Sequence, residues 1–547
     1  MSNIATSIAP PIETGMAATV EPKTATRGLR LAHLWVLAPL AIAWFAGSID
    51  FIEPYDFWWN VKSGQIMMQT GQFLGTDVLV WTPVREPYSN PQWGSQLLFY
   101  WLYNASPYLL LALRTLIITA TVGVVLWLCF WKTRSIRIAS MVAVLAYLTA
   151  WTNYGMRPQL FAFLPFIGFL FLLERKDSHP KWLPLLVPIM LFWANVHGSF
   201  FLGVALMGIY SVGTLLEKIG IKEGRKWLIS KAAGWQALWL GLAALVTLAN
   251  PYFLFIYNYF FIATNDPIAR ALNVEWQAPT IYGGTGQLFF LNLFVFVVSI
   301  YLSKRRMRLT EILLVLAFGY LSLVSLRNVM WWGWVTAPII AANFAAWRGM
   351  RGEGRGARDE GLGVEDEDDV VGEGISSEQE HLAPRPSPLA PRRTEIPAFN
   401  WLIAGLLIGG ALLFTPLWRQ ANPLVPAPAR AALSADTPTK LAQFLGKGEV
   451  PAPIFNYMEW GGYLGWELYP RYQMFVDGRF EARKVEVWND YLSVSRGHAN
   501  WQKTLDRYGV KTLVLNKEFH DNLIPLVAQD VTWRKVYEDK AGVVFTR

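Results

Sequence analysis

The sequence predicts an α-helical polytopic membrane protein, with about eleven transmembrane helices and a small external α/β domain at the C-terminus. Three observations predict this fold class. The chain of 547 residues has a mean hydropathy of +0.27, and only 16% of its residues are charged. It contains many apolar runs close to the length that crosses a bilayer. Residues 420–547 instead alternate short helix and strand patterns.

Short polar connectors separate the apolar runs. Including an uncleaved first helix, the predicted spans are residues 31–49, 107–131, 136–152, 158–173, 183–196, 199–216, 235–249, 286–302, 309–326, 329–347 and 400–418. The run at 183–196 is the weakest, because it is short and contains Pro184 and Pro188. Together with 158–173 it could be re-entrant, but removing this pair would place the basic connector 174–181 on the external side.

The charged connectors predict one orientation. Basic clusters occupy every second connector, at 132–137, 174–181, 217–226 and 303–308. The alternate connectors hold few basic residues, namely Lys62, Arg85, Arg157, Arg270 and Arg327. The positive-inside rule therefore places the N-terminus in the cytoplasm and the C-terminal domain outside. Because the net charge of +8 comes from these connector clusters and not from one basic stripe, we expect no nucleic-acid partner.

Composition divides the chain into five parts. Residues 1–30 are polar and predict a disordered cytoplasmic leader. Residues 31–348 form the transmembrane domain and include a long first external loop at 50–106. Residues 349–398 mix acidic, Gly-rich and Pro-rich stretches with few apolar residues, which predicts a disordered cytoplasmic linker. The last transmembrane helix, at 399–419, then leads into the external domain.

The external domain contains its own helix, strand and turn signals. Thr437-Pro438 predicts a helix N-cap followed by proline at the first helical position. Strand patterns occupy 453–457, 473–476 and 512–515. The sequence DKAG at 539–542 predicts the turn of a final hairpin.

Two residues inside the predicted spans limit the chemistry. Cys129 is the one cysteine, which excludes a disulfide or a cysteine zinc site within one chain. Arg114 is costly in hydrocarbon, so we expect it to be paired or functional.

Polar side chains with catalytic potential gather in the external connectors. Asp56 and Asn60 are one helical turn apart and share a face if residues 57–70 form an amphipathic interfacial helix. Asp56 follows an apolar run closely, where desolvation raises a carboxyl pKa and strengthens it as a base; capping the next helix is the structural alternative. The further candidates are Asp77, Arg157, Asn195, His197, Glu275 and Arg327.

Several of these residues also have a structural interpretation. Arg157, which precedes a proline, could contact lipid phosphate, and His197 could form an interhelical hydrogen bond. An interfacial aromatic belt is the interpretation for four tryptophans, Trp58, Trp59, Trp331 and Trp332.

An acid, arginines and a histidine at one membrane surface suit the transfer of a sugar from a polyprenyl phosphate. The lipid tail of such a donor stays in the bilayer while its phosphate lies at head-group depth. Asp56 would deprotonate the acceptor, and Arg157 or Arg327 would stabilise the departing phosphate. A divalent cation, Mg²⁺ or Mn²⁺, held by Asp56 and Asp77 could supplement the arginines.

Several motifs in residues 31–348 occur in the order YDFWWNVKSGQIMMQTGQFLGTD, QWGSQLLFYWLY, RPQLFAF, WANVHGSFFLG and LVTLANPY. In these motifs the chain resembles bacterial polytopic glycosyltransferases of the GT-C superfamily, which includes protein mannosyltransferases, oligosaccharyltransferases and aminoarabinose transferases. The resemblance implies an inverting, mannosyltransferase-like enzyme that depends on a polyprenyl-phosphate sugar. It maps the essential first-loop acid onto Asp56 and a second carboxylate onto Asp77.

The resemblance also implies a location and partners. The protein would lie in the bacterial cytoplasmic membrane with its active site facing the periplasm, and would act on a glycan, lipid or protein acceptor. The C-terminal FNYMEWGGYLGW and FVDGRFE are similar to the external domain of uncharacterised relatives, and would cover the site or bind the acceptor. Relatives commonly carry histidine at the position of Asn60, and losing that ligand counts against a metal.

Two other function classes stay open. A transporter or flippase of lipid-linked sugars predicts polar residues at mid-membrane depth and two similar halves; Arg114 fits this class, but no internal repeat is visible. A non-catalytic assembly subunit would use FVDGRFE to bind partners, although Gly478 more simply predicts a tight turn after a strand.

Overall fold

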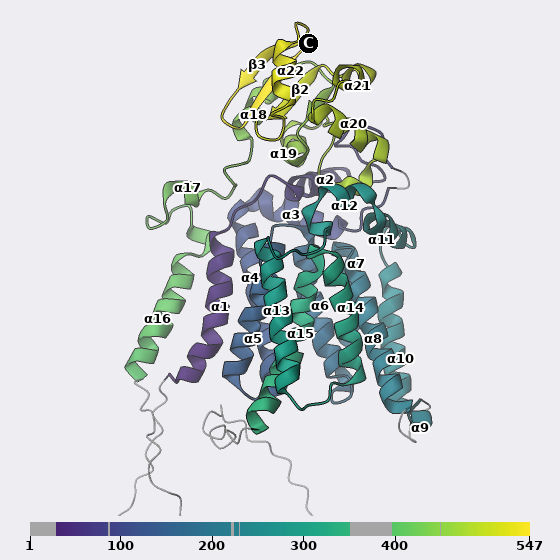
Figure 1. Ribbon diagram of the computed structural model, residues 1–547, viewed down its shortest axis with the longest axis vertical. Helices are drawn as coiled ribbons and strands as arrows, with labels where there is room; N and C mark the ends of the chain where they lie inside the picture. The colour runs from purple at the N-terminus through teal and green to yellow at the C-terminus, as the bar shows by residue number, and fades with distance from the viewer. Residues whose placement is uncertain (1–28, 86–87, 220–223, 229, 351–396, 449) are drawn as a thin grey trace, which may run out of the picture.

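The protein consists of a helical bundle with a smaller domain on one end (Figure 1). The computed structural model describes residues 29–85, 88–219, 224–228, 230–350, 397–448 and 450–547. Almost all of the predicted leader (1–30) and linker (349–398) lies outside these residues, so both remain predictions.

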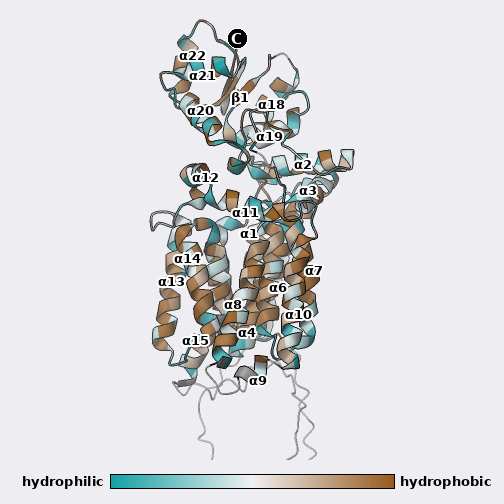
Figure 2. Ribbon diagram, turned by 90° about the vertical axis from the view of Figure 1, so that its right-hand side faces the viewer, coloured by the Kyte–Doolittle hydropathy of each residue, from teal (hydrophilic) through white to brown (hydrophobic). Residues whose placement is uncertain are grey.

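The bundle is formed by helices α1 (Leu31–Ile49), α4 (Pro107–Thr133), α5 (Ile136–Thr149), α6 (Phe163–Glu174), α7 (Leu186–Val196), α8 (Phe200–Ile219), α10 (Lys231–Leu245), α13 (Gly284–Leu302), α14 (Leu309–Val324), α15 (Val329–Met350) and α16 (Pro397–Leu413). The short α9 (Gly224–Leu228) precedes α10. The bundle is predominantly hydrophobic (Figure 2), as a lipid environment requires. Within the described residues, five helices are long and apolar enough to cross a membrane, and five shorter helices are apolar as well. The chain is an integral membrane protein.

Each predicted span coincides with one bundle helix. However, α10 is neither one of the five helices long and apolar enough to cross a membrane nor one of the five shorter apolar helices. The number of eleven spans therefore remains a prediction. The weak pair forms α6 and α7, and each follows a 3-10 segment, Pro158–Ala162 or Pro180–Leu185. Both segments begin with proline, which lacks the backbone N–H that a first turn leaves unbonded.

Arg114, inside α4, is paired as its burial requires. Its guanidinium donates to Asp50 Oδ2 at 2.7 Å and to the Gly47 carbonyl at 2.6 Å. Arg419 donates to the Asp50 carbonyl at 2.6 Å, beside the same helix end. Two arginines therefore bind groups at the C-terminus of α1, where the helix dipole favours positive charge.

Four short helices lie between the bundle and the C-terminal domain: α2 (Asp56–Thr70), α3 (Trp93–Ala105), α11 (Phe255–Asn265) and α12 (Pro267–Leu272). The predicted helix at 57–70 is α2. It packs so closely on α3 that a Cβ on Gly64 would lie 2.0 Å from the Gln96 carbonyl oxygen. The helices α3, α11 and α12 were not predicted from the sequence.

The aromatic-belt interpretation of the four tryptophans was wrong. Trp58, Trp59, Trp331 and Trp332 are each at most 6% exposed, so they pack inside the protein and not against lipid. The Trp58 ring meets Tyr463 of the C-terminal domain edge-to-face, with 4.8 Å between centroids.

The C-terminal domain has a four-stranded sheet with the strand order β1-β2-β4-β3. Its strands are β1 (Ile454–Asn456), β2 (Thr512–Asn516), β3 (Arg534–Glu538) and β4 (Gly542–Thr546). β1 and β2 are parallel, and the other pairs are antiparallel. Its helices are α17 (Ala427–Arg430), α18 (Thr439–Gly446), α19 (Met458–Leu468), α20 (Val485–Ser495), α21 (Trp501–Arg507) and α22 (Leu523–Gln529). The expected strands at 453–457 and 512–515 and the final hairpin are present. The helix expected to begin at Pro438 begins one residue later, at Thr439, so its N-cap is Pro438 and not Thr437.

The predicted strand at 473–476 does not join this sheet. Its strand-like backbone pairs instead with the first external loop, through a parallel bridge between Met474 and Val80. The Trp81 N–H donates to the Met474 carbonyl at 3.0 Å, and the Arg85 N–H donates to the Ala482 carbonyl at 2.9 Å. Backbone hydrogen bonds therefore hold the first loop along one side of the C-terminal domain.

Asp77 holds this contact together. It is 7% exposed, and its carboxylate pairs with Arg479 at 3.0 Å and with Arg483 at a shorter distance. Its Oδ1 also accepts the Leu79 N–H at 3.0 Å. Burial raises the pKa of Asp77, but the two guanidinium groups outweigh that effect and hold it below its usual range.

We expect Asp77→Asn to weaken this docking by about 3 kcal/mol, because it leaves a buried arginine without its counter-charge. Hydrogen exchange of full-length protein in lipid should show faster exchange at 473–483. The matched control is Asp521→Asn, at an exposed position in the same domain. Equal protection of 473–483 in both variants would contradict this role.

Candidate functional site

A cavity of about 420 Å³ lies where the bundle meets the C-terminal domain. Six of the eight candidate residues line it: Asp56, Asn60, Arg157, His197, Glu275 and Arg327. Because these residues come from five separate segments, only the folded chain brings them together. Asn195 and Asp77 do not line it.

Asp56 is the first residue of α2, and Tyr55 is the N-cap, which makes no side-chain cap bond. The Asp56 carboxylate lies 3.6 Å from Arg157 Nε. Burial raises the pKa of Asp56, and Arg157 only partly offsets this effect. One turn later, the Asn60 amide donates to the Asp56 carbonyl at 2.7 Å and accepts from Gln96 at 3.0 Å. Asn60 therefore fixes the start of α2 against α3.

Arg157 connects two carboxylates. Besides Asp56, it donates to Glu275 through a short hydrogen bond. Burial raises the pKa of Glu275, but Arg157 and Arg327 outweigh burial, so it lies below its usual value. The positive charge of Arg157 is therefore largely compensated before any ligand binds.

Arg327 is less constrained. Its guanidinium lies 5.3 Å from the centroid of the Trp276 ring. Among the residues that the structure describes, no carboxylate forms an ion pair with Arg327, whereas Arg157 pairs with both Asp56 and Glu275. It is the cation in the cavity that is most available to an anionic ligand.

His197 follows α7. Its Nδ1 accepts the Ser199 N–H at 3.1 Å and lies 2.8 Å from Ser199 Oγ; the first contact favours the neutral tautomer with the proton on Nε2. Burial lowers the pKa of His197 to about 3, with a smaller contribution from Arg327. At neutral pH this residue is an uncharged hydrogen-bond donor.

Some of the residues that line the cavity are apolar. Phe201, Leu202 and Ala205 come from the first turns of α8, and Leu321 comes from the last turn of α14. The cavity lining therefore combines charged residues from the connectors and the C-terminal domain with apolar residues from two bundle helices.

A loop of the C-terminal domain completes the cavity with Gly478, Arg479, Phe480 and Glu481. A Cβ on Gly478 would lie 2.6 Å from Asp56 Oδ1, so any larger residue at this position would have to displace the Asp56 carboxylate. The sequence analysis expected the C-terminal domain to cover the site, but it named none of these four residues as site residues. The signal was an Asp-Gly-Arg turn directly after an apolar strand, which is where sites form in α/β domains.

Buried Asn456, at the end of β1, fixes this loop. Its Oδ1 accepts the Phe475 N–H at 2.7 Å, and its amide donates to the Val476 carbonyl at 2.9 Å. Arg479 is held by ion pairs with Asp477 and Asp77. The loop is therefore positioned before a ligand arrives.

The two remaining candidates have structural contacts. The Asn195 side chain accepts from Trp93 Nε1 at 2.9 Å and donates to the Ala249 carbonyl at 3.0 Å, which ties α7 to its neighbours. Asp77 already has both oxygens bonded and does not share the cavity with Asp56. This pair therefore does not fit one metal site. In the described part of the chain, no group of three His, Cys, Asp or Glu side chains could hold a metal ion.

The architecture is similar to that of known membrane enzymes. The oligosaccharyltransferase of Archaeoglobus fulgidus tethered to an acceptor peptide has a TM-score of 0.52 and 12% identity, covering 94% of this chain and 74% of that one. The same archaeal protein with an inhibitory peptide and a dolichol-phosphate gives 0.52 and 12%, covering 93% and 74%. No protein-family model and no curated protein matches the sequence. The likeness shows that this chain has a fold similar to that of the archaeal oligosaccharyltransferase.

We expect His197 to make stability depend on pH. Between pH 6.5 and about 3 the unfolded chain protonates this histidine and the folded chain does not, so the free energy of unfolding falls as pH drops below 6.5. From pH 6.5 to 5, wild type should lose up to about 2 kcal/mol more than His197→Gln. Thermal melting in lipid at both pH values tests this; identical pH dependence would contradict it.

Proposed function

We propose that this protein is a membrane glycosyltransferase that moves a sugar from a polyprenyl-phosphate donor to an acceptor. The observation that carries this proposal is the lining of the main cavity, which combines charged and apolar residues. Arg327 and the Nε2–H of His197 offer sites for a phosphate and a sugar, while α8 and α14 offer an apolar surface to a lipid chain. A water-soluble sugar donor would make no use of that apolar surface.

The proposed reaction is a direct displacement with inversion. The acceptor hydroxyl gives its proton to the Asp56 carboxylate as its oxygen bonds to the anomeric carbon. The bond from that carbon to the phosphate oxygen breaks, and polyprenyl phosphate leaves with the electron pair. Arg327, assisted by Arg157, stabilises the negative charge on the departing phosphate.

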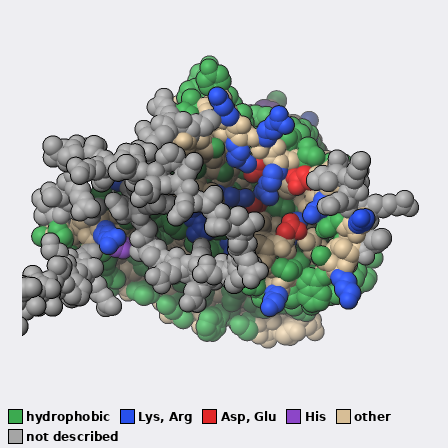
Figure 3. Space-filling model, turned by 90° about the horizontal axis from the view of Figure 1, so that it is seen from below, with side chains coloured by type: hydrophobic (Ala, Val, Ile, Leu, Met, Phe, Trp, Pro, Cys, Tyr) green, Lys and Arg blue, Asp and Glu red, His purple; other side chains and the backbone are tan. Residues whose placement is uncertain are grey.

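We place the cavity on the external side of a bacterial cytoplasmic membrane. The opposite end of the bundle carries the basic residues (Figure 3), which supports a cytoplasmic position for that end. The exposed members are Arg134, Arg137, Lys181, Lys226, Lys231, Lys304, Arg306 and Arg308. The glycan, lipid or protein acceptor would then approach from the periplasm.

The transporter alternative receives little support. Arg114, the mid-span residue that favoured it, is paired with Asp50 at the end of α1 and does not line the cavity. The polar residues of the cavity lie at the end of the bundle next to the C-terminal domain and not at its middle.

We expect Asp56→Asn to lower sugar transfer at least about 100-fold, because an amide cannot accept the acceptor proton. The assay is transfer from a panel of polyprenyl-phosphate sugars by purified protein in lipid. Asp436→Asn, in an exposed position, is the matched control. Full activity in Asp56→Asn would overturn the assignment.

A chelator arm of the same assay tests for a cation. Because Arg157 already lies against both Asp56 and Glu275, we expect EDTA to leave the transfer rate unchanged. Loss of transfer with EDTA and recovery with Mg²⁺ or Mn²⁺ would restore a metal to the mechanism.

Gly478→Ala should impair transfer about tenfold or more with little change in melting temperature. The added methyl group must displace the Asp56 carboxylate, from which it would lie 2.6 Å. Gly75→Ala is the matched control, because a Cβ there meets nothing within 4 Å. Unchanged transfer in Gly478→Ala would show that the loop does not approach Asp56 in the working enzyme.

A further inference from the structure

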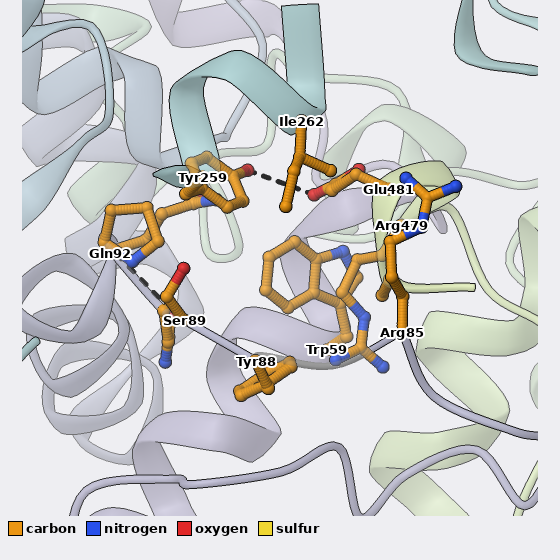
Figure 4. A pocket seen from close by; sticks show the side chains of 12 residues that line it. Trp59, Arg85, Tyr88, Ser89, Gln92, Tyr259, Ile262, Arg479 and Glu481 are labelled. Carbon is orange, nitrogen blue, oxygen red and sulfur yellow. Dashed lines mark hydrogen bonds between the residues drawn. The ribbon is translucent and has the colours of Figure 1, made fainter. Parts of the chain in front are cut away.

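A second, smaller cavity lies beside the main one (Figure 4). We call it the side cavity. Its volume is about 40 Å³, which is room for about three water molecules. Four parts of the chain line it: Trp59 of α2, Arg85 and residues 88–92 of the first loop, Tyr259 and Ile262 of α11, and Arg479, Glu481 and Ala482 of the C-terminal domain.

The side cavity shares a wall with the main cavity. The residues that line both are Trp59, Gln92, Tyr259, Arg479 and Glu481. This wall lies close to the reacting groups, because Gly478, which approaches Asp56, is three residues before Glu481. A ligand in the side cavity would therefore lie next to the site where the sugar is transferred.

Glu481 is the carboxylate of the shared wall. Its Oε1 accepts a hydrogen bond from the Tyr259 hydroxyl at 3.0 Å (Figure 4). Within the ranges that the structure describes, Glu481 forms no ion pair, whereas Asp56 and Glu275 both pair with Arg157. Burial raises the pKa of Glu481.

Two arginines line the side cavity, and each forms its ion pairs with other carboxylates: Arg85 pairs with Asp266 at 2.9 Å, and Arg479 pairs with Asp77 and Asp477. The face of the Arg479 guanidinium covers the Trp59 ring at 4.9 Å. Glu481 therefore retains unbonded acceptor positions beside a small polar space. Such a site favours a neutral hydrogen-bond donor and repels a phosphate or a carboxylate.

We propose that the side cavity is the subsite for the nucleophilic hydroxyl group of the acceptor, and that Glu481 holds this group by accepting its hydrogen bond. The inference rests on the glycosyltransferase function proposed above. The acceptor is therefore an alcohol whose hydroxyl-bearing carbon enters about 40 Å³ of space. The hydroxyl lies at the shared wall, where Glu481 orients it, and Asp56, which lines the main cavity together with Glu481, takes its proton.

A cysteine at position 89 tests whether the side cavity serves the acceptor. Cys129 is buried, so Ser89→Cys gives the full-length protein one accessible thiol, which methyl methanethiosulfonate can modify. We use undecaprenyl phosphate to measure binding of the donor lipid, and glycerol as the acceptor. Modification should reduce transfer to glycerol at least tenfold while leaving undecaprenyl phosphate binding unchanged, and glycerol should slow the modification.

Three results would overturn the proposal. If modification removes undecaprenyl phosphate binding as well, the side cavity belongs to the donor site. If fully modified protein transfers normally to glycerol, the acceptor does not use this space. If wild-type protein neither binds undecaprenyl phosphate nor transfers any sugar, the glycosyltransferase function itself fails, and the subsite fails with it.

Substitution of Glu481 supplies the second test. Glu481→Gln should raise the KM for glycerol about tenfold, because a charged acceptor of the hydrogen bond becomes neutral, while the KM for the donor stays unchanged. Glu486→Gln, exposed in the first turn of α20, is the matched control. A merely structural Glu481 would instead lower kcat or the melting temperature at constant KM for glycerol.

Discussion

The ion pairs of Asp77 with Arg479 and Arg483 are the interaction on which the site depends. Both arginines belong to the C-terminal domain and Asp77 to the first external loop, so the contact closes a gap of some four hundred residues in the sequence. Three charges buried together are stable only if their geometry is maintained, since any separation leaves a charge without its partner. These pairs therefore fix the position of the C-terminal domain, and they place Gly478 so close to Asp56 that a Cβ at this position would lie 2.6 Å from Asp56 Oδ1.

Charge compensation then decides what the cavity can bind. Arg157 lies between Asp56 and Glu275, and Arg479 is paired behind the loop, so both have little charge to offer a ligand. Arg327 is the exception in the described cavity lining. One available cation suits a single phosphate better than a diphosphate, which agrees with a monophosphate lipid donor. The neutral His197 adds a hydrogen bond without adding charge.

The sequence supported the bundle because an apolar run has few alternatives to a membrane helix. It also supported much of the site, since helical spacing relates Asp56 to Asn60 and charge alternation assigns the external connectors. It could not locate Glu481, because contact between the first loop and the C-terminal domain depends on long-range pairing. The strand pattern at 473–476 was real, but its partner lay in another part of the chain. The prediction that the four tryptophans contact lipid was wrong, because an aromatic side chain suits lipid and protein surroundings equally.

The order of the chain has a consequence for synthesis. The ribosome completes α1 to α15 long before it reaches residues 478–481, which form the last wall of the cavity. Until that segment has been translated and translocated, Asp56 and Arg157 line an open groove without Glu481. In the enzyme proposed above, a chain truncated before residue 478 therefore keeps Asp56 and Arg157 but lacks the residue that orients the acceptor.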